Sequence, residues 1–316
     1  MQTHLFYAKI YIISLFRFAM IEIIDILLYA AAFVTLFIGT ITDIKQREVP
    51  DWLNYSMIFF AFGSRIIYSM IAHNWNYLLY GVYGGILFLL VALIMFYSGQ
   101  WGGGDSKTLI AIGALIGLNA DYNNILWSSF SSFLISLFVN ILVIGAAYGL
   151  VYSIFVAVKN RKAFSKEFIK VTGKNLKQIK IILISFFVPA VLLFFFVSNI
   201  FRLLLAMLAI MLVLISFLFL FIKAVEKACM FRHVKPSELT EGDWIAKDII
   251  IAGKRITGPK DLGISEKQIN QLVRFYKSRK IKKVLIKVGI PFIPSFLVAF
   301  ITTFFVGNIL LLFFNL

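Results

Sequence analysis

Two aspartates stand where long apolar segments meet polar loops: Asp43 in "IGTITDIKQREVPDW" and Asp105 in "QWGGGDSKTLIAIG". Two carboxylates brought together at a low-dielectric boundary cannot both ionise easily, so one keeps its proton while the other stays charged. Such a pair can activate a water against a peptide carbonyl. The charged group takes a proton from the water, and the neutral group donates one to the carbonyl oxygen. This chemistry requires neither a metal nor a cofactor, and we expect none.

Three glycines, Gly102, Gly103 and Gly104, lead into Asp105. A backbone without side chains lets a substrate strand come close, which favours a binding role for this turn. Simpler interpretations exist for each aspartate by itself. Asp105 could cap the helix that follows, and Asp43 could be an ordinary interfacial charge. The pair, with a glycine-rich lead into one member, favours an aspartyl dyad.

The composition indicates a membrane protein. Of the 316 residues, 61% are hydrophobic and 15% charged, whereas about a quarter of a soluble chain is charged. Uncharged runs recur, and a membrane-spanning helix needs about 20 apolar residues. A single cysteine and three scattered histidines provide no disulfide and no metal-ligand spacing. We therefore predict an all-α polytopic protein with about eight transmembrane helices and a small α+β cytoplasmic domain. The expected spans are 22–42, 54–72, 78–98, 106–120, 125–158, 181–199, 200–222 and 290–314.

The expected organisation follows these spans. Several glycines lie inside them, where they either let helices approach closely or are simply tolerated. The β-branched, alternating stretch around 243–257 and the helical pattern at 265–280 predict the α+β domain. The expected segments are an N-terminal apolar extension at 1–21 that is possibly not native, a catalytic membrane core at 22–158, a basic cytoplasmic loop at 159–180, two further transmembrane helices at 181–222, a small basic cytoplasmic domain at 223–289 and a C-terminal transmembrane helix at 290–316.

The basic residues predict how the chain is oriented. Of 31 Lys and Arg, eight lie in 159–180 and sixteen in 223–289, while Lys45, Arg47 and Lys107 flank the two aspartates. These regions fall on one side if the spans alternate from residue 22, and the positive-inside rule makes that side cytoplasmic. The net charge of +16 is thus a topology signal. Membrane lipids are expected partners, because the basic domain suits anionic head groups, and nucleic acid is not.

The motifs carry a resemblance to a known family. Gly102, Gly104 and Asp105 fit the Gly-x-Gly-Asp motif of intramembrane aspartyl proteases. The stretch "TDIKQREVPDWLN" resembles the first-aspartate region of type IV prepilin peptidases, with Asp43, a basic residue and Val before Pro. The segment "KVLIKVGIPFIPSFLVAFITTFF" is similar to the closing segment of archaeal members. Bacterial members commonly carry paired Cys-x-x-Cys motifs and methylate the new N-terminus. With one cysteine, this chain resembles the archaeal branch, and we expect no methyl transfer.

The resemblance implies a plasma-membrane aspartic-type endopeptidase that removes the short basic leader from pilin-like or archaellin precursors at the cytoplasmic face. Asp43 and Asp105 would be the catalytic pair. The expected substrate-binding residues are Gly102, Gly103, Gly104, Arg47, Glu48 and Asp51. Glu48 and Asp51 would attract the positive leader, although solvated loop charges explain them equally well.

Three other functions are compatible with parts of the sequence. A transporter could relay protons through paired membrane carboxylates, although transporters more often hold them near the bilayer midplane and show internal repeats. A presenilin-like intramembrane protease would share the Gly-x-Gly-Asp motif but not the first-aspartate stretch. A non-catalytic scaffold would tolerate replacement of both aspartates.

Overall fold

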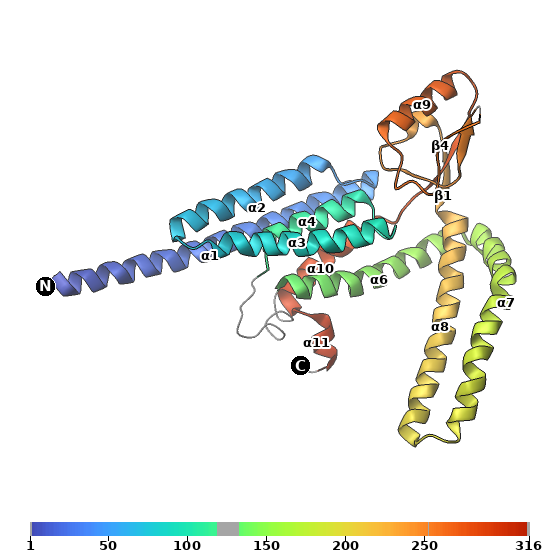
Figure 1. Cartoon of the computed structure of the whole chain (residues 1–316), viewed down its shortest axis with the longest axis horizontal. Helices are drawn as coiled ribbons and strands as arrows, with labels where there is room; N and C mark the ends of the chain where they lie inside the picture. Colours follow the sequence, from blue (N-terminus) through green and yellow to red (C-terminus); the bar gives the residue numbers. More distant parts are fainter. Residues whose placement is uncertain (1, 119–132, 252, 315–316) are drawn as a thin grey trace. The chain divides into compact units, whose positions relative to one another are not determined.

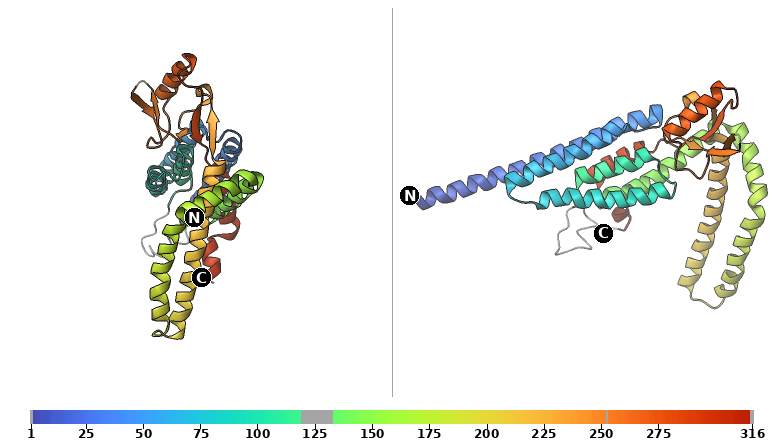
Figure 2. Two further views of the ribbon diagram at one scale, coloured as in Figure 1. Left: turned by 90° about the vertical axis from the view of Figure 1, so that its right-hand side faces the viewer. Right: turned by 45° about the horizontal axis from the view of Figure 1, so that its top comes forward.

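The computed structural model describes residues 2–118, 133–251 and 253–314 and is mostly helical (Figures 1 and 2). It falls into two compact units, one formed by Met1–Gly149 with Gly289–Leu316 and the other by Leu150–Val288. Among the described residues, six helical segments are long and apolar enough to cross a membrane. They are Ile23–Gln46 in α1 (Gln2–Gln46), α2 (Asp51–Ala72), α3 (Asn76–Tyr97), α6 (Phe133–Lys159), α7 (Arg161–Phe194) and α8 (Asn199–Cys229).

The remaining two of the eight expected spans are shorter helices, so six of the helices in the described residues, rather than eight, have the length expected of a crossing helix. The span expected at 106–120 is α4 (Gly103–Ile116), which ends at Gly117 with φ +74°. The span expected at 290–314 is split into α10 (Ile293–Val306) and α11 (Ile309–Phe314), with Gly307 at φ +80° between them. A glycine in the left-handed region ends a helix without the steric penalty that a side chain would bring.

In the first unit, α4 lies in the middle of the helices that form the core. It packs against α1, α2 and α3, and α10 packs along α1 (Figure 1). The fully buried side chains of α4 include Leu109 and Leu115, and they join a hydrophobic cluster with residues of α1, α3, α6 and α10. Because most of this short helix is buried among its neighbours, its N-terminal turn is held in a fixed place within the unit.

A buried arginine holds the other end of α4. Arg65 of α2 is 3% exposed, and its guanidinium donates to the carbonyl oxygens of Leu115 at 2.8 Å and Ile116 at 3.0 Å. It also donates to Ala114 at 3.2 Å and to Tyr77 of α3 at 2.9 Å. The last carbonyls of a helix have no partner within the helix and carry partial negative charge. The arginine therefore caps a helix that ends inside apolar surroundings.

The second unit begins with the end of α6 and continues as a hairpin of α7 and α8. Residues 161–180, expected as part of a basic loop, are instead the first half of α7. Lysine is a good helix former, and the apolar residues of this half, Phe164, Phe168 and Val171, pack against Leu220 and Ala224 of α8. The basic side chains can thus stay exposed while the opposite face of the helix is buried.

The unit ends in a small mixed α/β region. Strands β1 (Phe231–Val234), β5 (Val284–Lys287) and β2 (Trp244–Ile245) form an antiparallel sheet in the order β1-β5-β2. Strands β3 (Ile249–Ile251) and β4 (Lys254–Thr257) pair separately. A short 3-10 turn, η2 (Pro236–Glu238), and helix α9 (Glu266–Lys277) cover the sheet core, with Leu272 fully buried. Because α8 runs to Cys229, this region starts later than the expected residue 223.

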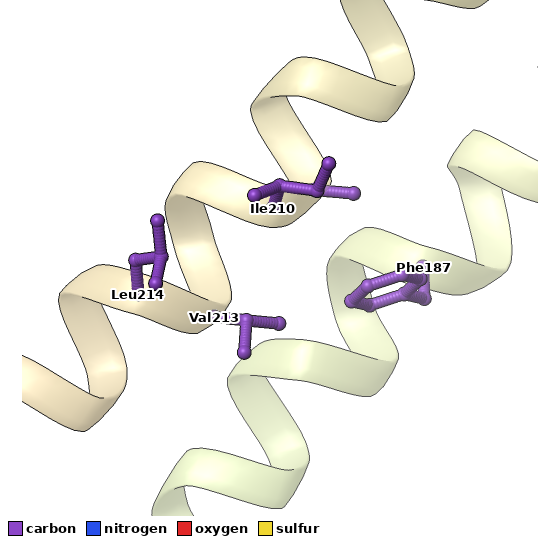
Figure 3. Close-up of a pocket in the computed structure, with 5 residues that line it drawn as sticks. Phe187, Ile210, Val213 and Leu214 are labelled. Atoms are coloured by element: carbon purple, nitrogen blue, oxygen red, sulfur yellow. The ribbon is translucent and has the colours of Figure 1, made fainter.

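A groove of about 260 Å³ lies between α7 and α8 (Figure 3). It is lined by Phe187, Ala209, Ile210, Val213 and Leu214. All of these side chains are apolar, so the groove offers no acid, base or nucleophile. The surrounding hairpin is largely exposed in the structure, as expected for helices that face lipid.

Candidate active site

Asp43 lies in the last turn of α1, with only 6% of the residue exposed. Its Oδ2 accepts a hydrogen bond of 3.0 Å from the backbone N–H of Ile293, the first residue of α10. Just beyond Asp43 the helix stops. Arg47 adopts a left-handed conformation with φ 60°, and its N–H donates to the Asp43 carbonyl at 2.9 Å. The Arg47 side chain donates to the carbonyl oxygen of Gly289. This end of α1 is therefore joined to the chain that enters α10.

Asp105 lies in the first turn of α4 and is half-buried. Its Oδ2 accepts a hydrogen bond of 3.0 Å from the N–H of Gly102, the residue before the helix. Asp105 therefore does help to cap α4, as the simpler interpretation of the sequence suggests. Within the described residues, no hydrogen-bond donor lies on its Oδ1. The capping role thus occupies one carboxylate oxygen and leaves the other for chemistry.

The two carboxylates are close enough to interact electrostatically. Asp105 lies outside the six helices that are long enough to cross a membrane. Burial, together with the nearby Asp43 carboxylate, raises the pKa of Asp105 to about 7, and the Gly102 N–H opposes this increase. A carboxyl group with such a pKa exchanges its proton near neutral pH, where a general acid or base works best.

Val49 links the two aspartate turns. A Cβ placed on Gly104 would lie 3.3 Å from the Val49 nitrogen and 3.5 Å from its Cβ, and one on Gly39 would lie 3.7 Å from Val49 Cγ1. The segment after α1 therefore passes directly against the glycine turn before Asp105. Because residue 104 is a glycine and has no side chain, its backbone can lie close to the backbone of Val49.

Two further groups support the turn that carries Asp105. Thr108 Oγ1 lies 2.9 Å from the Gly104 carbonyl oxygen and 3.1 Å from Asn54 Oδ1, and both polar side chains are fully buried. Trp101, 6% exposed, packs its ring against Phe292 at 5.8 Å and Phe296 at 5.3 Å between centroids. The turn is thus fixed by α2 on one side and by α10 on another.

The residues expected to bind substrate have different surroundings. Asp51 forms an ion pair with Lys107, whose Nζ lies 2.6 Å from Asp51 Oδ1 and 2.8 Å from Oδ2. This pairing competes with the capture of a basic leader. Glu48 is exposed and makes no ion pair within the described part of the chain. Gly103 is exposed, whereas Gly102 and Gly104 are half-buried.

Reasoning from the sequence missed the contribution of α10. Nothing in the pattern around Ile293 points to Asp43, although Pro291 and Pro294 mark a helix start. The interactions of Trp101 with Phe292 and Phe296 were missed for the same reason. Over 2–118, 133–251 and 253–314, no group of three or more His, Cys, Asp and Glu side chains could hold a metal ion.

Comparisons with known proteins relate the part of the chain that holds both aspartates to one family. Residues 30–158 match the model of the type IV leader peptidase family. A preflagellin peptidase of Methanocaldococcus jannaschii is 36% identical over 81 residues, which cover 26% of this chain and 34% of the relative. A preflagellin peptidase of Methanococcus maripaludis is 31% identical over 81 residues, covering 26% and 35%. The chain thus spans about a third of the length of these relatives. No solved structure matches the chain. Residues 30–158, which hold both aspartates, are thus similar to the type IV leader peptidase family.

Proposed function

We propose that this protein is a membrane aspartyl endopeptidase that removes the short basic leader from pilin-like or archaellin precursors. The observation that carries the proposal is that the turns of Asp43 and Asp105 pack together through Val49 inside the segment that matches the leader peptidase family. Neither feature alone would be sufficient, because a helix cap and an interfacial charge are both common. Together they support our proposal that the two carboxyl groups carry out aspartyl peptidase chemistry.

The mechanism uses one proton shared between the two carboxyl groups. The charged member takes a proton from a water molecule, and the resulting hydroxide attacks the carbonyl carbon of the scissile peptide. The neutral member donates its proton to the carbonyl oxygen as the tetrahedral intermediate forms. Transfer of a proton to the amide nitrogen then releases the leader. The raised pKa of Asp105, about 7, supports a singly protonated pair at neutral pH.

The substrate approaches along the glycine turn in this mechanism. Gly103 is exposed at the start of α4, and Gly102 and Gly104 present backbone without side chains. An extended peptide can therefore lie close to Asp105. Glu48, exposed at the end of the loop after α1, supplies the negative charge that attracts a basic leader. Asp51 contributes less to this attraction, because Lys107 already neutralises it.

The proposed active site faces the cytoplasm. Lys45, Arg47 and Lys107 flank the two aspartate turns, and basic residues concentrate in loops on the cytoplasmic side of membrane proteins. A cysteine placed at 48, in a chain where Cys229 is replaced by Ser, tests this orientation. A membrane-impermeant thiol reagent should label Glu48→Cys in inside-out vesicles and not in right-side-out vesicles. The reverse labelling would contradict the proposal.

Cleavage of a pilin precursor in membranes tests the activity. Asp43→Asn and Asp105→Asn each keep the shape of the side chain and remove the ionisable group. Each should lower cleavage by a factor on the order of 10²–10⁴, the typical contribution of a general acid or base. Glu241→Gln, an exposed carboxylate in the mixed α/β region, is the matched control and should cleave normally. Cleavage that survives both aspartate changes would favour the transporter or scaffold alternatives.

A further inference from the structure

Helix α10 contacts the proposed catalytic pair although it lies outside the family segment. Ile293 begins this helix, 250 positions after Asp43, and its backbone N–H donates to Asp43 Oδ2 at 3.0 Å. The segment that matches the leader peptidase family ends at residue 158. A backbone N–H at the start of a helix has no partner within the helix and stabilises negative charge.

Three contacts hold the start of α10 in place beside Asp43. The side chain of Ile293 is fully buried, and its Cγ2 would lie 3.3 Å from a Cβ on Gly39 of α1. Phe292 packs on Trp101, and the Arg47 side chain donates to the carbonyl oxygen of Gly289. The N–H of Ile293 is therefore fixed by packing on two sides and by a hydrogen bond at the chain entering the helix.

The charged surroundings of the two aspartates differ. Burial disfavours a charged Asp43, whereas the N–H of Ile293 in α10 and the guanidinium of Arg47 favour it. Asp105 receives one backbone N–H from Gly102 but has the Asp43 carboxylate as its charged neighbour. A cation and an amide N–H both favour a charged carboxylate, and a second carboxylate disfavours it.

We propose that the first turn of α10 is part of the catalytic centre, where the Ile293 N–H holds Asp43 as the ionised base and leaves Asp105 as the proton donor. This inference rests on the proposed peptidase function. Asp43 then takes the proton from the attacking water, and Asp105 gives its proton to the carbonyl oxygen of the substrate. Ile293 is a positioning residue, because it acts through Asp43.

Replacement of the amide tests the inference in the full-length chain. Ile293→Pro removes the N–H, and the first position of a helix tolerates proline. Ile293→Ala shortens the side chain but keeps the N–H, so it controls for lost packing. A second pair leaves the Ile293 N–H in the chain: Arg47→Gln removes the cation and its hydrogen bond to the Gly289 carbonyl, and Arg47→Lys restores the cation. The pH dependence of kcat for cleavage of a pilin precursor is measured for all four variants.

The expected result is a selective change in the acidic limb of the pH profile. Losing a group that favours ionisation means that the base becomes charged only at higher pH. The acidic limb of Ile293→Pro should move up by about one pH unit relative to Ile293→Ala, and kcat on that limb should fall about tenfold. Arg47→Gln should move the same limb in the same direction, and Arg47→Lys should restore it. The alkaline limb should stay in place.

Other results of these measurements would distinguish an error in this inference from an error in the proposed peptidase function. Movement of the alkaline limb alone would mean that Asp105 ionises first, and the assignment of base and acid would be reversed. If neither Ile293→Pro nor Arg47→Gln moves a limb, α10 has no part in catalysis although the peptidase function stands. If the wild-type chain does not cleave the precursor, or Asp43→Asn still cleaves it, the proposed function itself fails.

Discussion

Gly84 of α3 and Gly113 of α4 lie backbone against backbone in the core of the first unit. A methyl group added to either glycine would overlap the carbonyl oxygen of the other, and both residues are buried. This contact lets α4 approach α3 closely along its middle. Small residues at helix crossings are the usual way for membrane helices to pack tightly.

Gly113→Ala should therefore destabilise the first unit. The added methyl group meets backbone that cannot rotate away, so we expect a loss of about 1–3 kcal/mol, the usual cost of overpacking. The measurement is thermal unfolding of the purified protein in detergent. Gly63→Ala is the matched control, because among the described residues no atom other than its chain neighbours and the backbone of its own helix lies within 4 Å of its added Cβ. An equal loss at both positions would show that helix packing is not the cause.

The glycines before Asp105 should differ in their tolerance of alanine. A Cβ on Gly104 would press against the Val49 backbone at 3.3 Å, whereas one on Gly103 would have Phe96 at 3.9 Å as its nearest neighbour. Alanine favours a helix at both positions. Gly104→Ala should reduce precursor cleavage by about tenfold or more, because displacement of Val49 misaligns the aspartate turns.

Gly103→Ala is the comparison for that change and should reduce cleavage less, because its added Cβ has Phe96 at 3.9 Å as its nearest neighbour and does not press on Val49. Initial rates of cleavage, normalised to the amount of folded protein, give the comparison. A stronger defect in Gly103→Ala would indicate that the substrate, rather than Val49, sets the size limit at this turn.

Leader recognition should depend more on Glu48 than on Asp51. Glu48→Gln removes an exposed charge that is not paired within the described residues, and should raise KM for a substrate with a basic leader. Asp51→Asn should have a smaller effect, because Lys107 already neutralises that carboxylate and exposed ion pairs are worth about 0–1 kcal/mol.

The comparison is made with precursors whose leader carries lysines or glutamines, at low and high salt. Salt screening should abolish the difference between the wild type and Glu48→Gln. A larger KM effect for Asp51→Asn would mean that the substrate displaces Lys107 from its partner.

Cleavage should decline as the pH rises through about 7. The pKa of Asp105 is raised to about 7, mainly by burial and further by the Asp43 carboxylate. If Asp105 is the proton donor, deprotonation above this pH removes the acid and kcat falls. The alkaline limb of the pH profile, recorded between pH 5 and 9, should bend near that value.

The raised pKa of Asp105 also predicts how the stability of the folded protein depends on pH. An aspartate with a folded-state pKa above its unfolded value binds more protons in the folded state between about pH 4 and 7. Its contribution to stability is thus present at low pH and is lost as the pH rises through the folded pKa. Asp105→Asn should flatten that part of the stability curve, measured as Tm against pH. An unchanged slope would show that Asp105 is ionised throughout.

The sequence alone determined the helical membrane class, the places of the long apolar helices and the identity of the two aspartates as candidates, although it predicted eight spans where the described residues hold six helices of crossing length. Hydrophobicity and length are local properties, and the glycine turn before Asp105 is a local motif, so both can be recognised without a structure. The same is true of α9, where Ser265 precedes a run of apolar residues at helical spacing. The basic half of α7 was expected to be a loop, because its many charged residues indicated a solvent-exposed segment. It forms a helix because the face opposite the basic side chains is apolar and packs against α8.

Tertiary structure decided the features that join distant parts of the chain. The N–H of Ile293 on Asp43 and the guanidinium of Arg65 at the end of α4 are contacts between different helices, and neither residue type indicates its partner. The lengths of α4 and α10 depend on glycines in the left-handed conformation, which an apolar run does not reveal. Both Gly113 and Gly63 lie inside helices, and only packing distinguishes them. A Cβ on Gly113 would overlap the backbone of Gly84, whereas a Cβ on Gly63 would meet no described atom outside its own helix and its chain neighbours. How closely two helices approach depends on the surfaces of both. The sequence of one helix does not show which surface of another helix it will meet.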